Sequence, residues 1–418
     1  MKLTQLSDKI QVKFNQFAHK YATGFNRPLQ RFVRQMLFGI LKSGDVQLNS
    51  IGRALQETLS LKKTTKRLGA HLGKPNLWEQ VIKNNLRTQR SYLKQCRYLI
   101  VDLSDIQKEY AEKMSGLANV RDGSTQQIGV GYWQCNVTGV DETGSLIVPC
   151  YSELYSLEEE SSSENQKILS AIRTVSAHSG KDNIWVVDRG GDRRNIMNPL
   201  LADDNQFIIR QVGDRDLYLN GERKPLKEIS RTVTLTERYT VTKRTNNKKV
   251  KEIYMCGAVR VKLDKNGKAL WLVVMKEQHK GYCWLLCHLK EDNIKAAIRT
   301  AFVGYGHRWK IEEVHRQIKC DYNLEKICLQ RYEALKTMNA LLWTAVSFLY
   351  TRLDNLSIEI ITHIELGLQN RKKWSDLIRF IYYKLAYAVK KLLALSKLYL
   401  SPINKSPTSH QLCLDISQ

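Results

Sequence analysis

Residues 98–102 read Tyr-Leu-Ile-Val-Asp, a short apolar run that ends on a carboxylate. An apolar run of this length, bounded by polar residues, is typical of a buried β-strand. The same pattern returns at residues 184–188, which read Ile-Trp-Val-Val-Asp. We therefore expect two buried strands, each ending in an aspartate at the edge of a sheet.

Further strands and helices are expected around these two runs. Alternating or β-branched patterns predict three more strands, at residues 127–138, 146–154 and 207–210. Helical spacing predicts a helix at about 157–177, with three glutamates in its first turn, and a second at about 193–201. The order of three strands, helix, strand, helix, strand predicts an α/β fold.

The rest of the chain is expected to surround this core. Residues 1–95 predict a basic helical DNA-binding region, and residues 96–330 the catalytic core. Turn signals within about 212–290 predict an inserted antiparallel β subdomain. Residues 331–418 predict a C-terminal helical region, with dimerisation as its possible role.

The charge of the chain points to a polyanionic partner. Among 418 residues, 66 Lys and Arg stand against 41 Asp and Glu, a net charge of +25, and the first 100 residues carry +15 of it. Such an excess favours contacts with phosphate backbones, so nucleic acid is the first partner to consider. A generic solvated surface, a ribosome and acidic lipid are the alternatives. Residues 48–55 and 62–68 form either a helix-turn-helix or an ordinary helical pair.

Several classes of protein are disfavoured. No apolar run reaches the roughly 20 residues that a bilayer span needs, and the first ten residues lack the apolar core of a signal peptide. These features predict a cytoplasmic protein without a membrane partner. The nine cysteines show no Cys-x-x-Cys pair, and Cys283, Cys287 and His288 fit an apolar strand better than a metal site.

Asp102 and Asp188 are the first candidate site residues, because strand ends project side chains from a rigid frame. An aspartate after a strand is as often a helix cap or a turn former. A lesser candidate, Asp105, lies three residues after the first of them.

The segment near residue 310 adds a polar helix face. At 100° per residue, Tyr305, Arg308, Glu312 and Lys319 fall within about 60° of one another. An apolar stripe on the same helix faces elsewhere, formed by Ile311, Val314 and Ile318. The face either carries chemistry or is a solvated surface with charged pairs.

The spacing Tyr305-x2-Arg308-x3-Glu312-x6-Lys319 resembles the YREK signature of the insertion sequence four family of DDE transposases. The segment from Asp188 to Asp192, which reads Asp-Arg-Gly-Gly-Asp, resembles the Asp-Arg-x-x-Asp segment of that family. Asp102 resembles its first carboxylate, although Leu-Ser-Asp follows here where family members often have Thr-Thr.

The resemblance implies a ribonuclease-H-like core with a β insertion. It further implies a DNA transposase that cuts element ends by hydrolysis and joins them to target DNA by transesterification. Double-stranded DNA is the implied partner, a homodimer the implied active complex, and the bacterial cytoplasm, next to the nucleoid, the implied location. The alternatives are a metal-dependent endonuclease without strand transfer and a non-enzymatic DNA-binding regulator derived from a transposase.

The implied site residues have two roles. Asp102, Asp188 and Glu312 are the catalytic carboxylates, and their oxygens suit Mg²⁺, for which Mn²⁺ should substitute. The implied DNA-binding residues are Tyr305, Arg308, Lys319, Arg189, Trp284 and Trp309. Trp284 lies 21 residues before Tyr305, where a transposon enzyme of the family places a stacking tryptophan. Burial in an apolar strand is the alternative for this ring.

Overall fold

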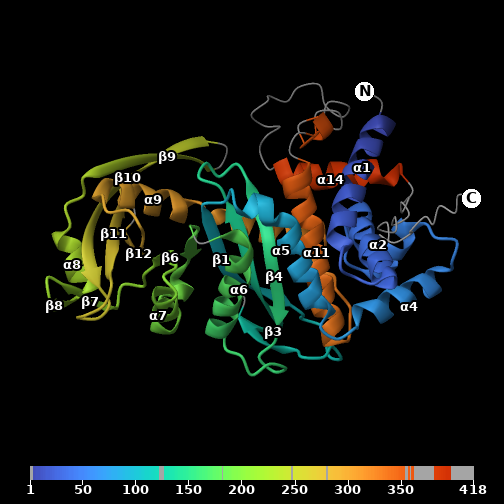
Figure 1. Cartoon of the computed structure of the whole chain (residues 1–418), viewed down its shortest axis with the longest axis horizontal. Coiled ribbons are helices and arrows are strands. Elements are labelled where there is room, and N and C mark those ends of the chain that lie inside the picture. The colour runs from blue at the N-terminus through green and yellow to red at the C-terminus, as the bar shows by residue number, and fades with distance from the viewer. Residues whose placement is uncertain are drawn as a thin grey trace, which may run out of the picture.

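A computed structural model describes the chain at residues 3–121, 127–180, 182–245, 248–278, 281–353, 356–357, 359–361 and 381–396. It is a mixed α/β protein in which a large mixed sheet is flanked by many helices. The N-terminal helices gather at one end, on the right of Figure 1, and the sheet extends away from them to the left. No helix within the described ranges is long and apolar enough to cross a membrane.

The first 95 residues are helical, as predicted. The helices are α1 (Leu3–Ala22), α2 (Arg27–Ser43), α3 (Leu48–Leu55), α4 (Leu61–Leu72) and α5 (Leu77–Leu93). Local sequence sets the ends of α2, because the Asn26 side chain accepts a hydrogen bond from Leu29 N at 3.1 Å and Gly44 closes the helix in the left-handed region.

The sheet core follows the predicted order of elements. It consists of β1 (Tyr98–Gln107), β2 (Ala118–Arg121), β3 (Ile128–Val140), β4 (Ile147–Tyr155), α6 (Glu164–Ser179), β5 (Ile184–Val187), the short 3-10 helix η1 (Arg189–Gly191), α7 (Arg194–Ala202) and β6 (Gln206–Arg210). Strands β1, β5 and β6 are parallel neighbours, whereas β3 runs antiparallel to both β1 and β4. The short strand β2 was not predicted.

The prediction for the first helix of this core was wrong at its start. Helix α6 begins at Glu164 instead of near residue 157, so the glutamates at 158–160 precede the helix. The reason is a capping box, in which Ser163 accepts a hydrogen bond from Gln166 N and the Gln166 side chain accepts one from Ser163 N.

The strands expected in the β insertion are present and continue the core sheet. They are β7 (Asp216–Leu219), β8 (Glu222–Pro225), β9 (Glu237–Thr245), β10 (Lys248–Lys262), β11 (Ala269–Glu277) and β12 (Tyr282–His288), with α8 (Leu226–Thr232) between β8 and β9. Strand β12 pairs with β6, so the described strands form one twelve-stranded sheet. The predicted turn at Asn220 and Gly221 joins β7 to β8, with positive φ at both residues.

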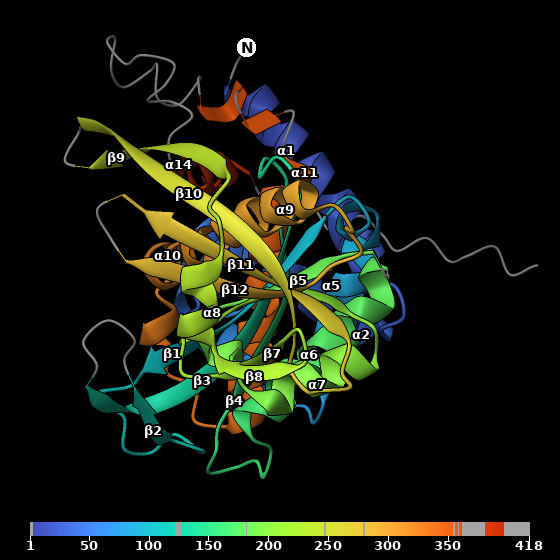
Figure 2. The same cartoon turned by 90° about the vertical axis from the view of Figure 1, so that its left-hand side faces the viewer.

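Helices of the C-terminal half pack both on the sheet and on the N-terminal helices. They are α9 (Ile294–Gly306), α10 (Trp309–Asp321), the 3-10 helix η2 (Leu324–Lys326), α11 (Tyr332–Arg352) and α14 (Ile381–Ala394). Helix α9 covers β10 and β11 (Figure 2). Helix α11 is buried along most of its length, and its Phe348 packs on Phe14 and Phe17 of α1. The N-terminal helices therefore share one core with α11. Of the C-terminal region, residues 354–355, 358, 362–380 and 397–418 lie outside the described part.

Candidate functional site

Two parallel strands bring Asp102 and Asp188 to neighbouring positions. Val101 of β1 pairs with Val187 of β5 at the last position of their ladder, and an aspartate follows each valine. Strand β5 ends there, as predicted. Strand β1 does not, because it continues to Gln107 with β3 as its partner. Asp102 thus marks the end of the parallel pairing, and the prediction that it ends the strand was wrong.

Helix α10 brings Glu312 to the same place, but the single helix predicted through residues 305–319 is broken. His307 and Arg308 form a turn between α9 and α10, where Arg308 N bonds Tyr305 O at 3.1 Å. The low helix propensity of Gly304 and Gly306 favours a break at this point. The apolar stripe of α10 is buried as predicted, with Ile311, Val314 and Ile318 at most 1% exposed.

Arg308 links two of the three candidate carboxylates. Its Nη2 lies 2.7 Å from Glu312 Oε1 and its Nη1 lies 3.6 Å from Asp188 Oδ2. The Arg308 side chain is 10% exposed, whereas those of Asp188 and Glu312 are 33% and 31% exposed. The guanidinium thus lies beneath two carboxylates that remain open to solvent.

The third carboxylate, Asp102, is half-buried and interacts with the same group of charges. Burial raises the pKa of Asp102 from its ordinary value of 3.8 to about 7. The cation of Arg308 lowers this pKa, and the charges of Asp188 and Glu312 raise it. The coupling means that β1, β5 and α10 bring all three predicted carboxylates and Arg308 within electrostatic reach of one another.

Tyr305 and Arg210 complete the polar cluster. The Tyr305 hydroxyl donates a hydrogen bond to Asp188 Oδ1 at 2.9 Å and accepts one from Arg210 Nη1 at 3.1 Å. Arg210 Nη1 itself lies 3.8 Å from Asp188 Oδ1. Arg210 was not predicted as a site residue. The signal was present in the sequence, because Arg210 ends the strand that runs parallel to β5.

Lys319 lies two turns along α10 and has other partners. Its Nζ is 3.2 Å from Glu325 Oε1 and 3.8 Å from Asp105 Oδ2. Asp105 also accepts a hydrogen bond from Gln107 Nε2 at 3.0 Å. Lys319 and the lesser candidate Asp105 are therefore brought together with each other, beside the cluster of Asp102, Asp188 and Glu312.

Of the two predicted tryptophans, Trp309 is open to solvent and Trp284 is half-buried. Trp309 is 59% exposed, and its ring lies 5.1 Å from the Arg308 guanidinium carbon. Trp284 is half-buried, because its ring packs against the core and lies next to Gly213, and the ring is parallel to that of Tyr282 at 6.4 Å. Arg189, on η1, is exposed. The Trp309 ring is thus the one placed to meet a ligand at the carboxylates.

The carboxylate oxygens of the cluster suit a divalent cation, but the guanidinium of Arg308 contacts two of the carboxylates. Asp102, Asp188 and Glu312 offer hard oxygens of the kind that Mg²⁺ prefers. In the described part of the chain, no three His, Cys, Asp or Glu side chains converge as ligands of one ion. The residue types therefore fit the ion, whereas Arg308 occupies two of the three carboxylates. The Cys283, Cys287 and His288 segment is strand β12, as the apolar pattern predicted.

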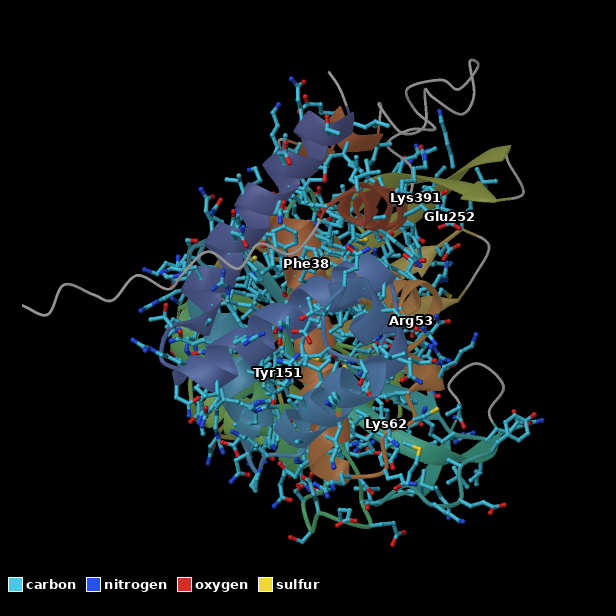
Figure 3. The ribbon with its side chains drawn as sticks, turned by 90° about the vertical axis from the view of Figure 1, so that its right-hand side faces the viewer. Phe38, Arg53, Lys62, Tyr151, Glu252 and Lys391 are labelled. Atoms are coloured by element: carbon cyan, nitrogen blue, oxygen red, sulfur yellow. The ribbon has the colours of Figure 1, made fainter. Side chains whose placement is uncertain are left out.

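A second feature is a groove beside helix α4. It has a volume of about 650 Å³ and lies between the α3–α4 pair and residues 328–329, with Lys62 and Lys66 in its wall. A neighbouring hollow of about 420 Å³ shares Lys66 and adds Arg331. Both lysines are exposed, while Thr64, Leu68 and Leu72 bury the opposite face of α4. Figure 3, which views the molecule from the right-hand side of Figure 1, labels Lys62.

Comparison with known proteins identifies no family for this chain. No protein-family model matches the chain, and no curated protein matches it in sequence.

The raised pKa of Asp102 predicts a pH-dependent difference in the free energy of unfolding between the wild type and an Asp102→Asn variant. Because the folded pKa of about 7 exceeds the ordinary value of 3.8, ionisation of Asp102 destabilises the fold as the pH rises from about 4 to 7. Asp102→Asn removes this charge. We expect the variant to gain stability relative to the wild type between pH 5 and pH 8, measured by urea unfolding in EDTA. A difference that stays constant over this range would contradict the assignment.

Proposed function

We propose that this protein is a DNA transposase with a ribonuclease-H-like core, which cleaves element ends and joins them to target DNA. The observation that carries the proposal is that β1, β5 and α10 bring Asp102, Asp188 and Glu312 within electrostatic reach of one another and of one arginine, Arg308. Three carboxylates, two of them just beyond the parallel pairing of β1 with β5 and the third on α10, suit metal-dependent chemistry on phosphodiesters. The positive charge of the chain supports a polyanionic substrate.

The sheet supports the finer fold assignment. Its central strands lie in the order β4-β3-β1-β5-β6, with β1, β5 and β6 parallel and β3 antiparallel to its neighbours. This arrangement agrees with a ribonuclease-H-like core. Strands β7–β12 extend the sheet beyond β6 through the pairing of β12 with β6, which agrees with an insertion between the second aspartate and the glutamate.

The roles of the side chains follow from their chemistry. Asp102, Asp188 and Glu312 would hold Mg²⁺, which activates an attacking oxygen and stabilises the leaving oxygen of a displacement at phosphorus. Arg308 presents a planar fork that can bind a phosphate through two hydrogen bonds. Tyr305 orients Asp188 through its hydroxyl.

The DNA would extend over residues around this centre. Trp309 offers a ring on which a base can stack, and Lys319 and Arg189 add charge for phosphates. The homodimeric complex on paired ends and the location beside the bacterial nucleoid are parts of the same proposal.

A cleavage and joining assay tests the function. The DNA that flanks the gene is searched for short inverted repeats, and a fragment carrying them is incubated with the full chain in Mg²⁺ or Mn²⁺. We expect cuts at the repeat ends and covalent joining to a target plasmid. Cuts without joining would instead support an endonuclease. Binding without cuts would support a regulator.

The groove beside α4 gives a prediction about DNA affinity. We expect Lys62→Gln with Lys66→Gln to weaken DNA binding about tenfold at low salt and to make its salt dependence shallower, because about two phosphate contacts are lost. Fluorescence anisotropy at several salt concentrations measures both effects. Point substitutions are preferable to removing the N-terminal helices, since these share a core with α11.

The matched control for the groove removes the same charge elsewhere. Lys20 and Lys83 are exposed on α1 and α5. Lys20→Gln with Lys83→Gln should leave the salt dependence closer to that of the wild type. Equal losses in the two double variants would show that the overall charge, and not the groove, sets the affinity.

A further inference from the structure

Arg308 contacts two of the carboxylate oxygens that a divalent cation at this site would need, one on Asp188 and one on Glu312. One nitrogen of its guanidinium contacts Glu312 Oε1 and another faces Asp188 Oδ2. With a side chain only 10% exposed, it reaches both carboxylates from the protein side. This buried arginine therefore neutralises part of the negative charge of the cluster when no cation is present.

The second oxygen of Asp188 is engaged as well. Asp188 Oδ1 accepts the hydrogen bond from Tyr305, which is itself held by Arg210. The carboxylate of Asp188 is thus fixed between Tyr305 on one oxygen and Arg308 on the other. Glu312, one helical turn after Arg308, is held by a pair at an (i, i+4) spacing.

A guanidinium and a divalent cation compete for the same carboxylate oxygens. Charge-assisted hydrogen bonds from arginine to carboxylate are among the stronger polar contacts in proteins, and they are stronger when shielded from water. Phosphate offers the same fork an equivalent partner. A phosphodiester that draws Arg308 away would release Asp188 and Glu312 to a cation.

We propose that Arg308 is an internal competitor of the divalent cation. In the free protein it holds Asp188 and Glu312 and so weakens metal binding, and it transfers to a phosphate when DNA is bound. Metal and DNA then bind with positive coupling, which by linkage is the same in both directions. This inference rests on the proposed function, because it requires that Asp188 and Glu312 hold the metal.

Mn²⁺ binding to the full chain without DNA provides the test, with free Mn²⁺ followed by electron paramagnetic resonance. We expect Arg308→Gln to bind Mn²⁺ about tenfold more tightly than the wild type, equivalent to about 1.4 kcal/mol. Arg308→Lys keeps the charge but lacks the fork, so we expect an intermediate gain of about threefold. The lysine variant also serves if the glutamine variant fails to fold, as judged by circular dichroism.

Arg210→Gln separates competition from the general effect of charge. Arg210 is also a cation near Asp188, at 3.8 Å, but it contacts Asp188 and Tyr305, whereas Arg308 contacts Asp188 and Glu312. We expect this variant to bind Mn²⁺ less tightly than Arg308→Gln by at least about threefold. Equal gains in the two variants would overturn the proposal, as would unchanged or weaker binding in both Arg308 variants.

Further outcomes distinguish this inference from the proposed function. Cleavage by the wild type, with Mn²⁺ affinity unaffected by either Arg308 substitution, would refute the competition and leave the function standing. Asp188→Asn that binds Mn²⁺ as well as the wild type would overturn both. A DNA duplex added to the wild type should tighten Mn²⁺ binding, and should tighten it less in Arg308→Gln.

Discussion

We expect Asp188→Asn to lower metal-dependent DNA cleavage by about a thousandfold or more while DNA binding remains. The substitution removes a carboxylate charge from the cluster but keeps the shape of the side chain. Loss of a metal ligand removes several kcal/mol of transition-state stabilisation, which corresponds to a loss of this size. Cleavage of end DNA in Mg²⁺, followed in single-turnover reactions, measures the effect. Asp102→Asn and Glu312→Gln should give losses of the same order.

Asp105→Asn is the matched control on the same strand. Asp105 lies three residues after Asp102, yet its partners are Lys319 and Gln107. We expect this variant to keep most of the cleavage activity. If Asp105→Asn were inactive and Asp102→Asn active, the first carboxylate would have been assigned to the wrong residue.

DNA binding should survive these substitutions because the charges that we propose attract DNA lie elsewhere. The exposed lysines of α4 belong to the N-terminal helices, whereas the carboxylates belong to the sheet and to α10. Binding that disappears together with cleavage would indicate that the carboxylates hold the fold together. Circular dichroism and urea unfolding of each variant distinguish this case.

The two buried strands and the end of β5 could be predicted from the sequence, but the end of β1 could not. The apolar runs before Asp102 and Asp188 identify two buried strands, and parallel pairing then brings the two aspartates together. The extra length of β1 depends on β3, which supplies hydrogen bonds beyond Asp102. A pattern within one strand does not contain that information.

Helix α10, which carries Glu312 and Lys319 of the predicted polar face, was also predicted only in part from the sequence. Its apolar stripe predicted the buried side of α10 correctly, because burial follows the period of the helix. The break at His307 and Arg308 places Tyr305 on α9, so one ideal helix was the wrong description. Spacing alone also did not show that Arg308 contacts Asp188, since this contact forms between elements distant in sequence.

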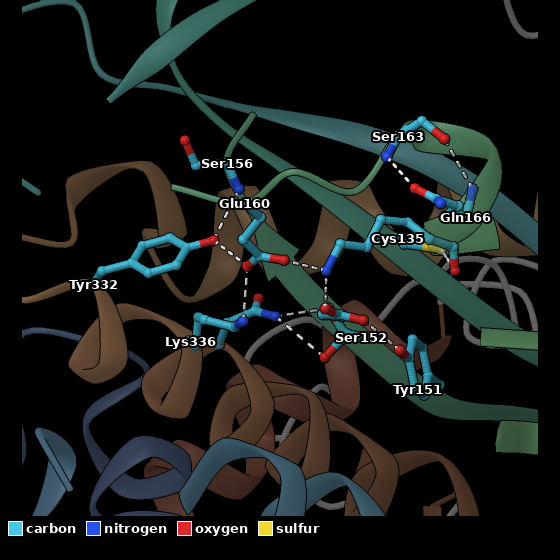
Figure 4. Close-up of polar contacts among 12 residues, drawn as sticks. Cys135, Tyr151, Ser152, Ser156, Glu160, Ser163, Gln166, Tyr332 and Lys336 are labelled. Atoms are coloured by element: carbon cyan, nitrogen blue, oxygen red, sulfur yellow. Dashed lines mark hydrogen bonds and ion pairs between the residues drawn. The ribbon is translucent and has the colours of Figure 1, made fainter. Parts of the chain in front are cut away.

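The second large effect is expected in a charged network that includes Glu153 of β4, two strands away from Asp102 in the sheet (Figure 4). Lys167 of α6 pairs with Glu153 of β4 at 2.6 Å and with Glu160, which also pairs with Lys336 of α11 at 2.9 Å. The Tyr332 hydroxyl donates a hydrogen bond to Glu160 at 2.6 Å. The network joins the sheet to two helices that cover it, with balanced charge.

We expect Lys167→Met to destabilise the protein by about 3–5 kcal/mol. Glu153, 5% exposed, would lose its cationic partner while remaining buried, and an unpaired buried charge is costly. The midpoint of urea unfolding at pH 7 measures the loss. The control is Lys83→Met, which breaks an exposed pair with Glu79 and should cost at most about 1 kcal/mol.

The loss of stability caused by Lys167→Met should be smaller in acid, because Lys167 helps to lower the pKa of Glu160. Burial alone would raise the pKa of Glu160, but hydrogen bonds from Lys167, Tyr332 and Lys336 outweigh it and lower the pKa below the ordinary value of 4.5. A lowered carboxyl pKa contributes stability that is present above pH 4.5 and is lost as the pH falls through the folded value. The wild type should therefore lose more stability below pH 4.5 than the variant, since the variant lacks one of the cations that lower this pKa. A pH-independent difference between the two proteins would show that Lys167 stabilises the fold through packing and not through its charge.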